Sequence, residues 1–477
     1  MIKLEKTIAG WVMCVYRTKY YDYDKTPICV LKKEEYDFIK KAFHGGRTET
    51  IRPYKKWNEE ELNNGVGGRY LDIQSLYPSV QFYDDMPYGE PKWIEENITD
   101  IDKINKMINE NYGWFEVDII MNKKLYMCPL VSKETGKLTA DCLDKNKQVF
   151  HSVELKEALN CGCKITKIHS GLIMDATKDM FKDFIKDFLE MKVNASEKPN
   201  KETLNKLNLT YEDWIEYHEK EFEFTPNPNY NAGLRSISKM VLNSLWGKFG
   251  QRPDMPKNEY IHKDKISRWY DLLRDNEKQK KLIKSQEVCC NGEYMYVAFC
   301  ELDDNNNEVL KSTNLAIASS TTANAGMRLF KELKPLDKRV LYHDTDSIIY
   351  EHDPQKYNIK EGLFLGEWEC ETKGKLITEF VSIGAKSYAY KVEDKVKDCK
   401  MKGISLHYDN SNKVNFEGML KLVKGNTDKI ITDKNVRFDK NKENGISTTM
   451  ITKEVKATLD KRIVKEDYYS YPFGYVN

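Results

Sequence analysis

Three aspartates stand where the sequence predicts the ends of strands, and their carboxylates could bind metal ions together. Asp72 ends the apolar run RYLDI, and Asp344 and Asp346 occupy the tight turn of VLYHDTDSIIYEH, which is typical of a β-hairpin. If these strands pair, the three carboxylates meet. Mg²⁺ prefers carboxylate oxygens, and two such ions about 3.5–4 Å apart promote phosphoryl transfer. Aspartate also favours turns for local hydrogen bonding, so Asp344 and Asp346 alone would not establish a site.

The turn after Asp72 could bind the phosphates and the sugar of a nucleotide. Backbone N–H groups at Ser75, Leu76 and Tyr77 could point at phosphate oxygens. The Tyr77 ring, packed beneath the sugar, would leave no room for a ribose 2′-hydroxyl and so would select deoxynucleotides. A core tyrosine before a proline is the simpler alternative for this residue.

A predicted helix over residues 233–248 places four polar or aromatic side chains on one face. Arg235, Lys239, Asn243 and Trp246 follow one another at steps of four, four and three residues. The cationic end could hold a triphosphate while Asn243 and Trp246 border a new base pair. A solvated charged face would explain the two cations but not the Asn-Ser-Leu-Trp-Gly run. A second predicted helix offers a weaker candidate for a phosphate contact, Lys192.

Four residues near the end of the chain could contact the backbone of a primer and its template without reading bases. Lys386 and Tyr388 in GAKSYAYK lie on the same side of a predicted strand, which suits a phosphate and a sugar edge of the primer. Lys400 and Lys402 could touch duplex backbone in the same way. An ordinary charged surface explains the last two equally well.

The elements that must position these residues follow a mixed α and β order. Residues 1–42 contain the strand-like run WVMCVY and then the helix-like run LKKEEYDFIKKAF, after which Gly45 and Gly46 mark a linker. The glycine pair would also let the backbone approach template phosphates closely, and a hinge is the alternative. RYLDI predicts a short buried strand that ends in a turn at LYPS and leads to a loop at MPYGEPKW.

The middle of the chain predicts an insertion followed by helices. Strand-like runs WFEVDII and CKITKIHSGLIM, with a helix at VELKEAL, predict a small α+β insertion. Amphipathic helices from Phe181 through Lys192 and over 233–248 predict a helical hairpin with a long charged tip. The stretch NEKQKKLIK predicts an exposed face or loop, and a helix over 316–333 precedes the Asp-Thr-Asp hairpin. Residues from about 395 predict a separate small lobe.

Composition favours an ordered globular protein. The 477 residues are 32% charged and 12% aromatic, and Lys+Arg at 76 against Asp+Glu at 75 leave a net charge of +1. A nucleic-acid surface would therefore be a local patch. The 11 cysteines lack CxxC spacing, which favours a reduced intracellular protein. The sequence shows neither a signal peptide nor a membrane span, so we expect a soluble protein.

Taken together, YLDIQSLYPS, KMVLNSLWGKFG and YHDTDS resemble the A, B and C motifs of family B DNA polymerases. The segments GGRTE, PYGEP, KSYAYK, CKMKGISL and DKRIVKEDYYSYPFGY are similar to those of the protein-primed branch found in Polinton/Maverick elements, adenoviruses, virophages and linear plasmids. The resemblance covers nearly the whole chain from about Lys32. It implies an α+β right-hand polymerase with an antiparallel palm sheet, helical-hairpin fingers and a thumb. Such an enzyme extends DNA primers from deoxynucleoside triphosphates with two Mg²⁺ ions, for which Mn²⁺ can substitute.

The resemblance also implies roles for individual residues. Asp72 and Asp346 would be the direct metal ligands, assisted by the carbonyl of Ile73, with Asp344 as a nearby essential carboxylate. Tyr77 would exclude ribonucleotides. Contacts with the triphosphate or the nascent base pair would come from Lys192, Lys239, Asn243 and Trp246, and contacts with the primer terminus from Lys386 and Tyr388.

The implied domains are a linker over residues 1–68, palm motif A over 69–83, an α+β insertion over 84–175, fingers over 176–250, palm over 251–394 and a thumb over 395–477. In this branch the insertion serves protein priming and processivity, so a terminal protein primer is an expected partner. Only 71 residues precede Asp72, so we expect the proofreading exonuclease domain to be absent. Trp246 stands where many family B enzymes have Tyr, which affects only fine base selection.

Two alternatives to an active DNA polymerase stay open at the level of the sequence. The first is a catalytically impaired, DNA-binding remnant of a mobile element, suggested by the short upstream region, although the intact carboxylates of Asp72, Asp344 and Asp346 count against it. The second is an RNA-templated or RNA-making polymerase. The Asp-Thr-Asp turn, in place of Asp-Asp, and Tyr77 both disfavour it.

Overall fold

A nine-stranded antiparallel sheet, here called the palm sheet, is the centre of the molecule. The computed structural model describes residues 7–134, 136–252, 255–302, 308–309, 313–441 and 445–476. The main order is β1-β12-β13-β3-β15-β16-β17, with β14 beside β3 and β2 beside β15. The strands are β1 (Thr48–Thr50), β2 (Tyr54–Lys56), β3 (Gly67–Ile73), β12 (Val340–Asp344), β13 (Ser347–His352), β14 (Trp368–Cys370), β15 (Ile377–Gly384), β16 (Ser387–Val392) and β17 (Lys395–Lys400). The predicted strand at RYLDI and the predicted Asp-Thr-Asp hairpin are both confirmed, as is the α+β class.

Helices cover one face of the palm sheet, which we call the rear face. Leu71 and Ile348 on this face join one continuous apolar core with Leu329 and Phe330 of a long helix, α12. This burial is what orients the sheet, because alternate strand residues must point to opposite faces. The covering helices are α2 (Lys33–Ala42), α4 (Leu76–Tyr83) and α12 (Leu315–Leu336), with the short helices α3 (Glu59–Asn63) and η3 (Asp337–Arg339) at the edges.

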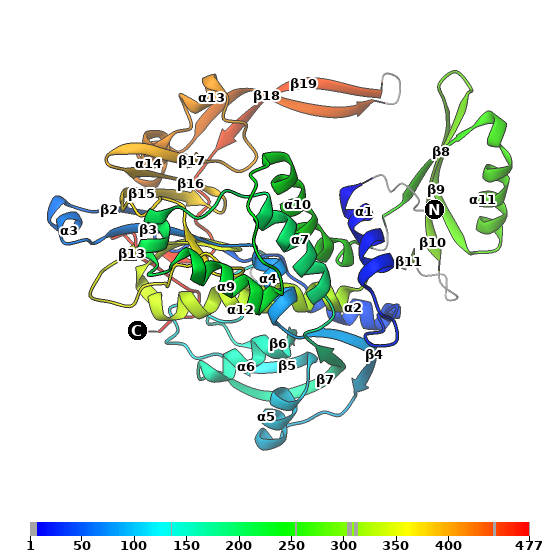
Figure 1. Cartoon of the computed structure of the whole chain (residues 1–477), viewed down its shortest axis with the longest axis horizontal. Coiled ribbons are helices and arrows are strands. Elements are labelled where there is room, and N and C mark those ends of the chain that lie inside the picture. Colours follow the sequence, from blue (N-terminus) through cyan, green and yellow to red (C-terminus); the bar gives the residue numbers. More distant parts are fainter. Residues whose placement is uncertain are drawn as a thin grey trace.

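The predicted α+β insertion is a four-stranded sheet of order β4-β7-β5-β6 with its own core (Figure 1). The prediction of a loop at MPYGEPKW is wrong, because these residues form β4. Two prolines fit there because β4 is an edge strand, where a missing backbone N–H need not break a ladder hydrogen bond. The strand register also shifts around Gly89, whose φ is 76°. The elements are β4 (Met86–Ile94), α5 (Ile101–Glu110), β5 (Gly113–Ile120), β6 (Lys145–His151), α6 (Ser152–Asn160) and β7 (Lys164–Thr177).

The predicted helical hairpin is present as α7 (Lys182–Asn194) packed on α10 (Ala232–Phe249), with α8 (Lys201–Lys206) and α9 (Tyr211–Phe222) forming its tip. The strand prediction for WVMCVY is wrong. This run forms helix α1 (Ile8–Val15) and the π-helix η1 (Tyr16–Tyr20), and α1 packs on α10. Val12 and Tyr16 are completely buried there, and the Tyr16 hydroxyl donates to the Met180 carbonyl. Tertiary burial therefore overrides the strand propensity of these β-branched and aromatic residues.

Residues 257–302 and 308–309 include the strands of a separate small sheet that does not pair with the palm sheet, although the prediction placed this part of the chain in the palm. Figure 1 shows this unit at one end of the molecule. The stretch NEKQKKLIK lies here and is largely exposed, as predicted, with residues 278–280 connecting a helix to a strand. The elements are β8 (Lys257–His262), η2 (Lys263–Lys265), α11 (Ser267–Glu277), β9 (Lys281–Cys289), β10 (Tyr294–Leu302) and β11 (Glu308–Val309).

The C-terminal residues are not one lobe. β17 pairs with β16 inside the palm sheet, α14 packs on β15, and β18 and β19 form a projecting two-stranded ribbon (Figure 1). The last segment then returns to the palm and the insertion, where Arg462 Nη2 donates to the Tyr126 carbonyl at 3.1 Å. The elements are α13 (Tyr408–Ser411), α14 (Phe416–Val423), β18 (Ile430–Asn441), β19 (Gly445–Val455), β20 (Ile463–Val464) and β21 (Ser470–Tyr471). Among the described residues, no helix has the length and apolar character needed to cross a membrane.

Candidate active site

The palm sheet brings the three predicted aspartates to one place. Thr48 pairs with Asp344, Asp344 with Ser347, and Ser347 with Asp72, so these four residues form one row across β1, β12, β13 and β3. Residues that face each other across strands lie on the same side of a sheet. This side is the front face, opposite the covering helices. Asp346 lies in the two-residue turn between β12 and β13, and its carbonyl accepts from the Ile73 N–H at 2.7 Å.

Asp344 is already held by protein groups. Its carboxylate accepts from Thr48 Oγ1 at 2.6 Å and from Tyr342 Oη at 3.3 Å, and Lys386 Nζ lies 2.9 Å from both of its oxygens. A carboxylate with this many donors is fixed in orientation and has little free coordination capacity. Asp344 is therefore placed to shape the turn rather than to bind a cation directly.

Asp72 and Asp346 are in the opposite situation. Burial raises the pKa of Asp72 to about 7, and the neighbouring Asp346 carboxylate adds to the rise. Burial also raises the pKa of Asp346, and the Asp344 carboxylate contributes to this shift. Among the described residues, neither carboxylate is bonded to another side chain. The pair is thus a partly buried, uncompensated negative charge, which is the chemistry that a hard divalent cation fits.

The described residues hold no preformed cluster of three or more His, Cys, Asp or Glu side chains for a metal ion. The ligands that the resemblance implies, Asp72, Asp346 and the carbonyl of Ile73, therefore stay a prediction. Glu369 lies opposite Asp72 on the neighbouring strand β14 and is exposed. Its charge, like that of Glu371, further raises the pKa of Asp72.

The prediction of a turn at LYPS is wrong, because α4 begins at Leu76 and all four residues are helical, and the turn lies before them at residues 74–75. Ser75 precedes α4 in the left-handed region at φ 56°, so the first N–H groups of the helix open next to the aspartates. Such unpaired N–H groups favour an anion. The Tyr77 ring lies against the Trp246 ring of α10, with centroids 4.1 Å apart. Palm and fingers therefore meet at this aromatic pair.

The fingers present cations toward the same place. Lys192 Nζ of α7 donates to Ser75 Oγ at 3.0 Å. Burial lowers the pKa of Lys192 to about 8, and the charges of Lys239 and Arg235 lower it further. Lys239 in turn lowers the pKa of Asp72 and Asp346, so it lies near both. These three cations lie close together and repel one another. A bound triphosphate would relieve that repulsion. Asn243 is exposed on the same helix, between Lys239 and Trp246.

Lys386 and Tyr388 do not project from one strand as expected. Lys386 precedes β16 at φ 59° and binds Asp344, whereas Tyr388 is buried and shares a hydrogen bond of 3.1 Å with the Tyr70 hydroxyl. The reason is that the strand begins only at Ser387, so the alternation argument does not reach Lys386. Both residues nevertheless contact Tyr342, whose ring packs on the Tyr388 ring at 4.8 Å and whose hydroxyl accepts from the backbone N–H of Lys386.

The other predicted DNA contacts, at Gly45, Gly46, Lys400 and Lys402, lie in different surroundings. A Cβ on Gly46 would come within 2.2 Å of Thr345 Oγ1, so this glycine allows the chain to cross the Asp-Thr-Asp turn closely, whereas Gly45 has open space. Lys400 is exposed on the edge strand β17 and pairs with Asp398 at 3.4 Å. Lys402 lines a groove between the palm, the thumb ribbon and the insertion, together with Lys137, Lys456 and Lys461.

Comparison with known proteins identifies the family to which the chain belongs. The model of a family described as DNA polymerase type B, organellar and viral, matches residues 2–209 and 224–338. The chain belongs to this family. The match omits residues 210–223, which include the whole of α9. The resemblance of the A, B and C motifs to family B DNA polymerases is therefore confirmed.

Curated relatives of the family are longer than this chain. A probable DNA polymerase of Neurospora intermedia is 23% identical over 417 residues, which is 84% of this chain and 36% of the relative. One of Podospora anserina is 26% identical over 408 residues, covering 81% and 29% of the two proteins. The DNA polymerase of Bacillus phage phi29 is 24% identical over 224 residues, or 46% and 31%. The chain thus spans about a third of the length of these relatives.

Solved structures share the fold of the family. The Phi29 DNA polymerase with primer-template DNA aligns at a TM-score of 0.60 and 16% identity, over 95% of this chain and 68% of that chain. Its complex with primer-template DNA and incoming nucleotide aligns at 0.61 and 15% identity over the same shares. The chain therefore shares the overall fold of these solved structures over nearly its whole length.

The sequence missed several residues of the site. Tyr70 and Tyr342 lie two positions before Asp72 and Asp344, so strand alternation alone could have placed them on the front face. Thr48 gave no comparable signal, since its contact with Asp344 depends on β1 pairing with β12 from the other end of the chain. Glu369 also carried no signal, because β14 is only three residues long.

Proposed function

We propose that this chain catalyses the template-directed addition of deoxynucleotides to the 3′-hydroxyl of a DNA primer. The observation that carries the proposal is the pairing of an uncompensated carboxylate pair, Asp72 and Asp346, with an excess of positive charge at Lys192, Lys239 and Arg235. Nucleotidyl transfer needs both, because the attacking oxygen requires cations and the triphosphate requires positive partners. Membership of the DNA polymerase family supports the same reaction.

Asp72 and Asp346, with the Ile73 carbonyl, would hold two Mg²⁺ ions, for which Mn²⁺ could substitute. When bound, the ions would lower the pKa of the primer hydroxyl and offset charge on the leaving pyrophosphate. The two carboxylates supply negative charge where the end of β3 meets the turn between β12 and β13, and the pairing of these strands fixes their positions. Asp344 would keep the turn in place through Thr48, Tyr342 and Lys386 instead of contacting the ions.

The nucleotide would lie between α4 and the fingers. The open N–H groups at Ser75, Leu76 and Tyr77 would face phosphate oxygens, and Lys192 and Lys239 would neutralise the triphosphate. Because the Tyr77 ring packs against Trp246, it is held rigidly and would exclude the ribose 2′-hydroxyl by contact. Trp246 and Asn243 of the same helix would border the nascent base pair.

Primer-template DNA is the proposed partner of the front face and the basic groove. Lys386 and Tyr388 would support the primer terminus beside the aspartates, and Lys402 would contact backbone phosphates along the groove. Lys400, on the edge strand, and the Gly45 and Gly46 loop would contribute further backbone contacts. A terminal protein primer at the insertion stays a prediction of the resemblance. An impaired remnant gains no support, because the full set of carboxylates is present and assembled.

Primer extension tests the proposal. The purified chain, given Mg²⁺, a labelled primer-template and four deoxynucleotides, should extend the primer, whereas Asp346→Ala should not. Asp271→Ala, an exposed change on the distant helix α11, serves as the matched control and should extend like the wild type. Equal extension by the wild type and Asp346→Ala would mean that a contaminant produces the signal. If the wild type neither extends nor binds labelled nucleotide, the proposal is wrong.

A further inference from the structure

Behind the Asp-Thr-Asp turn, the rear face of the palm sheet carries charged side chains that the proposed reaction does not use. Glu49 of β1 pairs in register with His343 of β12, directly beside the Thr48 and Asp344 pair. Because strand residues alternate, Glu49 and His343 point to the rear while Thr48 and Asp344 point to the front. Glu49 is 1% exposed, His343 0% and Arg47 5%. Burial lowers the pKa of His343, so this side chain is neutral, whereas Glu49 and Arg47 are ionised groups, which are rarely buried to this degree without a specific reason.

Glu49 is stabilised as a carboxylate by its neighbours. Its Oε2 lies 3.5 Å from His343 Nε2 and 4.0 Å from Arg47 Nη2, and its Oε1 accepts from the Ala140 N–H at 2.9 Å. Burial alone would raise the pKa of Glu49, but His343 and Arg47 outweigh it and lower the pKa to about 2. Removing one member of such a group leaves the others buried without a partner, which is strongly destabilising locally.

The partners of Glu49 and Arg47 belong to the insertion. Ala140 and Cys128 lie at the two ends of one loop, and Arg47 Nη1 donates to the Cys128 carbonyl at 3.1 Å. The side chains of Glu49 and Arg47 therefore bind both ends of this loop, residues 128–140, on the face of the sheet behind the proposed metal site. Along the edge where β1 pairs with β12, the backbone just before β1 also holds the turn directly, because the Arg47 carbonyl accepts from the Thr345 N–H at 2.9 Å.

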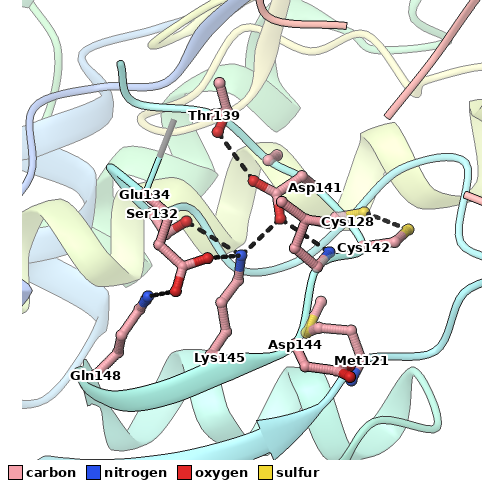
Figure 2. Close-up of polar contacts among 12 residues, drawn as sticks. Met121, Cys128, Ser132, Glu134, Thr139, Asp141, Cys142, Asp144, Lys145 and Gln148 are labelled. Atoms are coloured by element: carbon pink, nitrogen blue, oxygen red, sulfur yellow. Dashed lines mark hydrogen bonds and ion pairs between the residues drawn. The ribbon is translucent and has the colours of Figure 1, made fainter. Parts of the chain in front are cut away.

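The described residues at the base of the 128–140 loop are held by buried polar contacts, so this base can act as an anchor. Figure 2 shows the fully buried Lys145 amino group between Asp141 and Ser132, with Nζ distances of 2.6 Å and 3.1 Å. Cys128 and Cys142 lie side by side at the base of the loop, with their sulfurs 3.2 Å apart. A loop held by a buried ion pair and packed thiols has few alternative conformations.

We propose that Glu49 and Arg47 are positioning residues that fix the Asp-Thr-Asp turn by tying β1 to the 128–140 loop of the insertion. The inference rests on the proposed polymerase function for its kinetic consequence, but the mechanical link is independent of it. Groups one shell behind metal ligands typically change metal affinity or activity by about 10–100-fold when removed. The insertion would thereby be coupled to the metal site and would not be a separate appendage.

The kinetic test uses two Glu49 variants and a matched control. Glu49→Ala should lower kcat for primer extension by about 10–100-fold and raise the Mg²⁺ concentration for half-maximal rate. The Kd for primer-template DNA should stay within about twofold, because the DNA would lie on the other face. Glu49→Gln, which keeps the acceptor for the Ala140 N–H, should fall between the two. Glu379→Ala removes another buried palm carboxylate, bonded to Tyr54 and Lys391, and should leave kcat unchanged at temperatures well below unfolding.

Two results would overturn the inference. One is wild-type kcat and Mg²⁺ dependence in Glu49→Ala, and the other is an equal loss in Glu379→Ala, which would show general destabilisation. Hydrogen–deuterium exchange separates this inference from the polymerase proposal, since it needs no activity. In Glu49→Ala, amides of both the 344–347 turn and the 128–140 loop should exchange faster, by about tenfold or more, than in the wild type. Faster exchange confined to β1, or none, would exclude the link even if the wild type extends primers.

Discussion

The two faces of the palm sheet at the Asp-Thr-Asp turn carry carboxylates in opposite electrical surroundings. On the front face, burial and neighbouring carboxylates raise the pKa of Asp72 to about 7. On the rear face, Glu49 is still more deeply buried, yet His343 and Arg47 lower its pKa to about 2. Burial alone would raise the pKa of both groups, so their partners account for the opposite shifts. A carboxylate that the fold supplies with cations is structural, whereas one that it leaves uncompensated is available to a ligand.

This difference also separates stability from function. Natural proteins keep unfavourable charge arrangements where a ligand must bind and offset them elsewhere. Asp72 and Asp346 fit the first description, and Glu49 with Arg47 fits the second. The comparison therefore predicts opposite responses when a charge is removed from each face.

The largest expected effect is on the front face. Asp72→Asn should reduce primer extension by at least about 10³-fold, which corresponds to about 4 kcal/mol of transition-state stabilisation. The same change should raise the unfolding temperature in EDTA, because it relieves repulsion with Asp346. Glu49→Gln should lower the unfolding temperature under identical conditions. Differential scanning calorimetry at pH 8.5 measures both, and a lower unfolding temperature for Asp72→Asn would contradict the comparison.

A second prediction concerns the rigid aromatic contact on the front face. Tyr77→Val should reduce the preference for deoxynucleotides over ribonucleotides by on the order of 100-fold, since the packed ring would no longer fill the space of the 2′-hydroxyl. Tyr77→Phe keeps the ring and should retain the preference. Single-nucleotide incorporation with matched dNTP and rNTP gives the ratio. Unchanged discrimination in Tyr77→Val would assign sugar selection to another group.

Local patterns in the sequence predicted the front face well but not the rear face. Asp72, Asp344 and Asp346 end strands whose apolar alternation is visible, so their strands and turn could be identified. The run WVMCVY could not be assigned correctly, because a short apolar stretch buried among helices carries no distinguishing period. MPYGEPKW was taken as a loop because its prolines are tolerated only at a sheet edge, and edges depend on strand order. Glu49 carried no signal, since its partner Ala140 comes from a loop far along the chain.

The cationic side of the front face makes a third prediction. Burial, Lys239 and Arg235 lower the pKa of Lys192 to about 8, below its usual value of 10.5. The folded protein therefore binds this proton less tightly than the unfolded chain, and stability should rise as pH rises from about 8 toward 10.5. A bound triphosphate would restore the proton, so nucleotide binding near pH 8.5 should take up protons. Calorimetric titration of deoxynucleotide in buffers of different ionisation enthalpy measures this uptake.

Lys192→Met should abolish that proton uptake and weaken nucleotide binding about tenfold, the worth of one charged hydrogen bond. Lys182→Met, at the exposed start of the same helix, is the matched control and should change neither quantity. Proton uptake that persists in Lys192→Met would place the titrating group elsewhere among the fingers cations.

The prediction with the smallest expected effect concerns a second buried carboxylate near Arg47. It tests whether proximity to Arg47 alone decides if such a carboxylate is ionised. The charge of Arg47 also acts on Glu154 of α6, yet burial raises the pKa of Glu154 to about 7. The hydrogen bond that Glu154 accepts from the His151 N–H offsets this rise only in part. The folded state holds this proton more tightly than the unfolded chain, so stability should fall as pH rises from about 4.5 through 7, by on the order of 2 kcal/mol. Glu154→Gln should reduce that slope in urea unfolding measured between pH 5 and 8, and the part due to Asp72 and Asp346 should remain. Glu110→Gln, exposed at the end of α5, should preserve the full slope. An unchanged slope in Glu154→Gln would show that Glu154 does not titrate in this range.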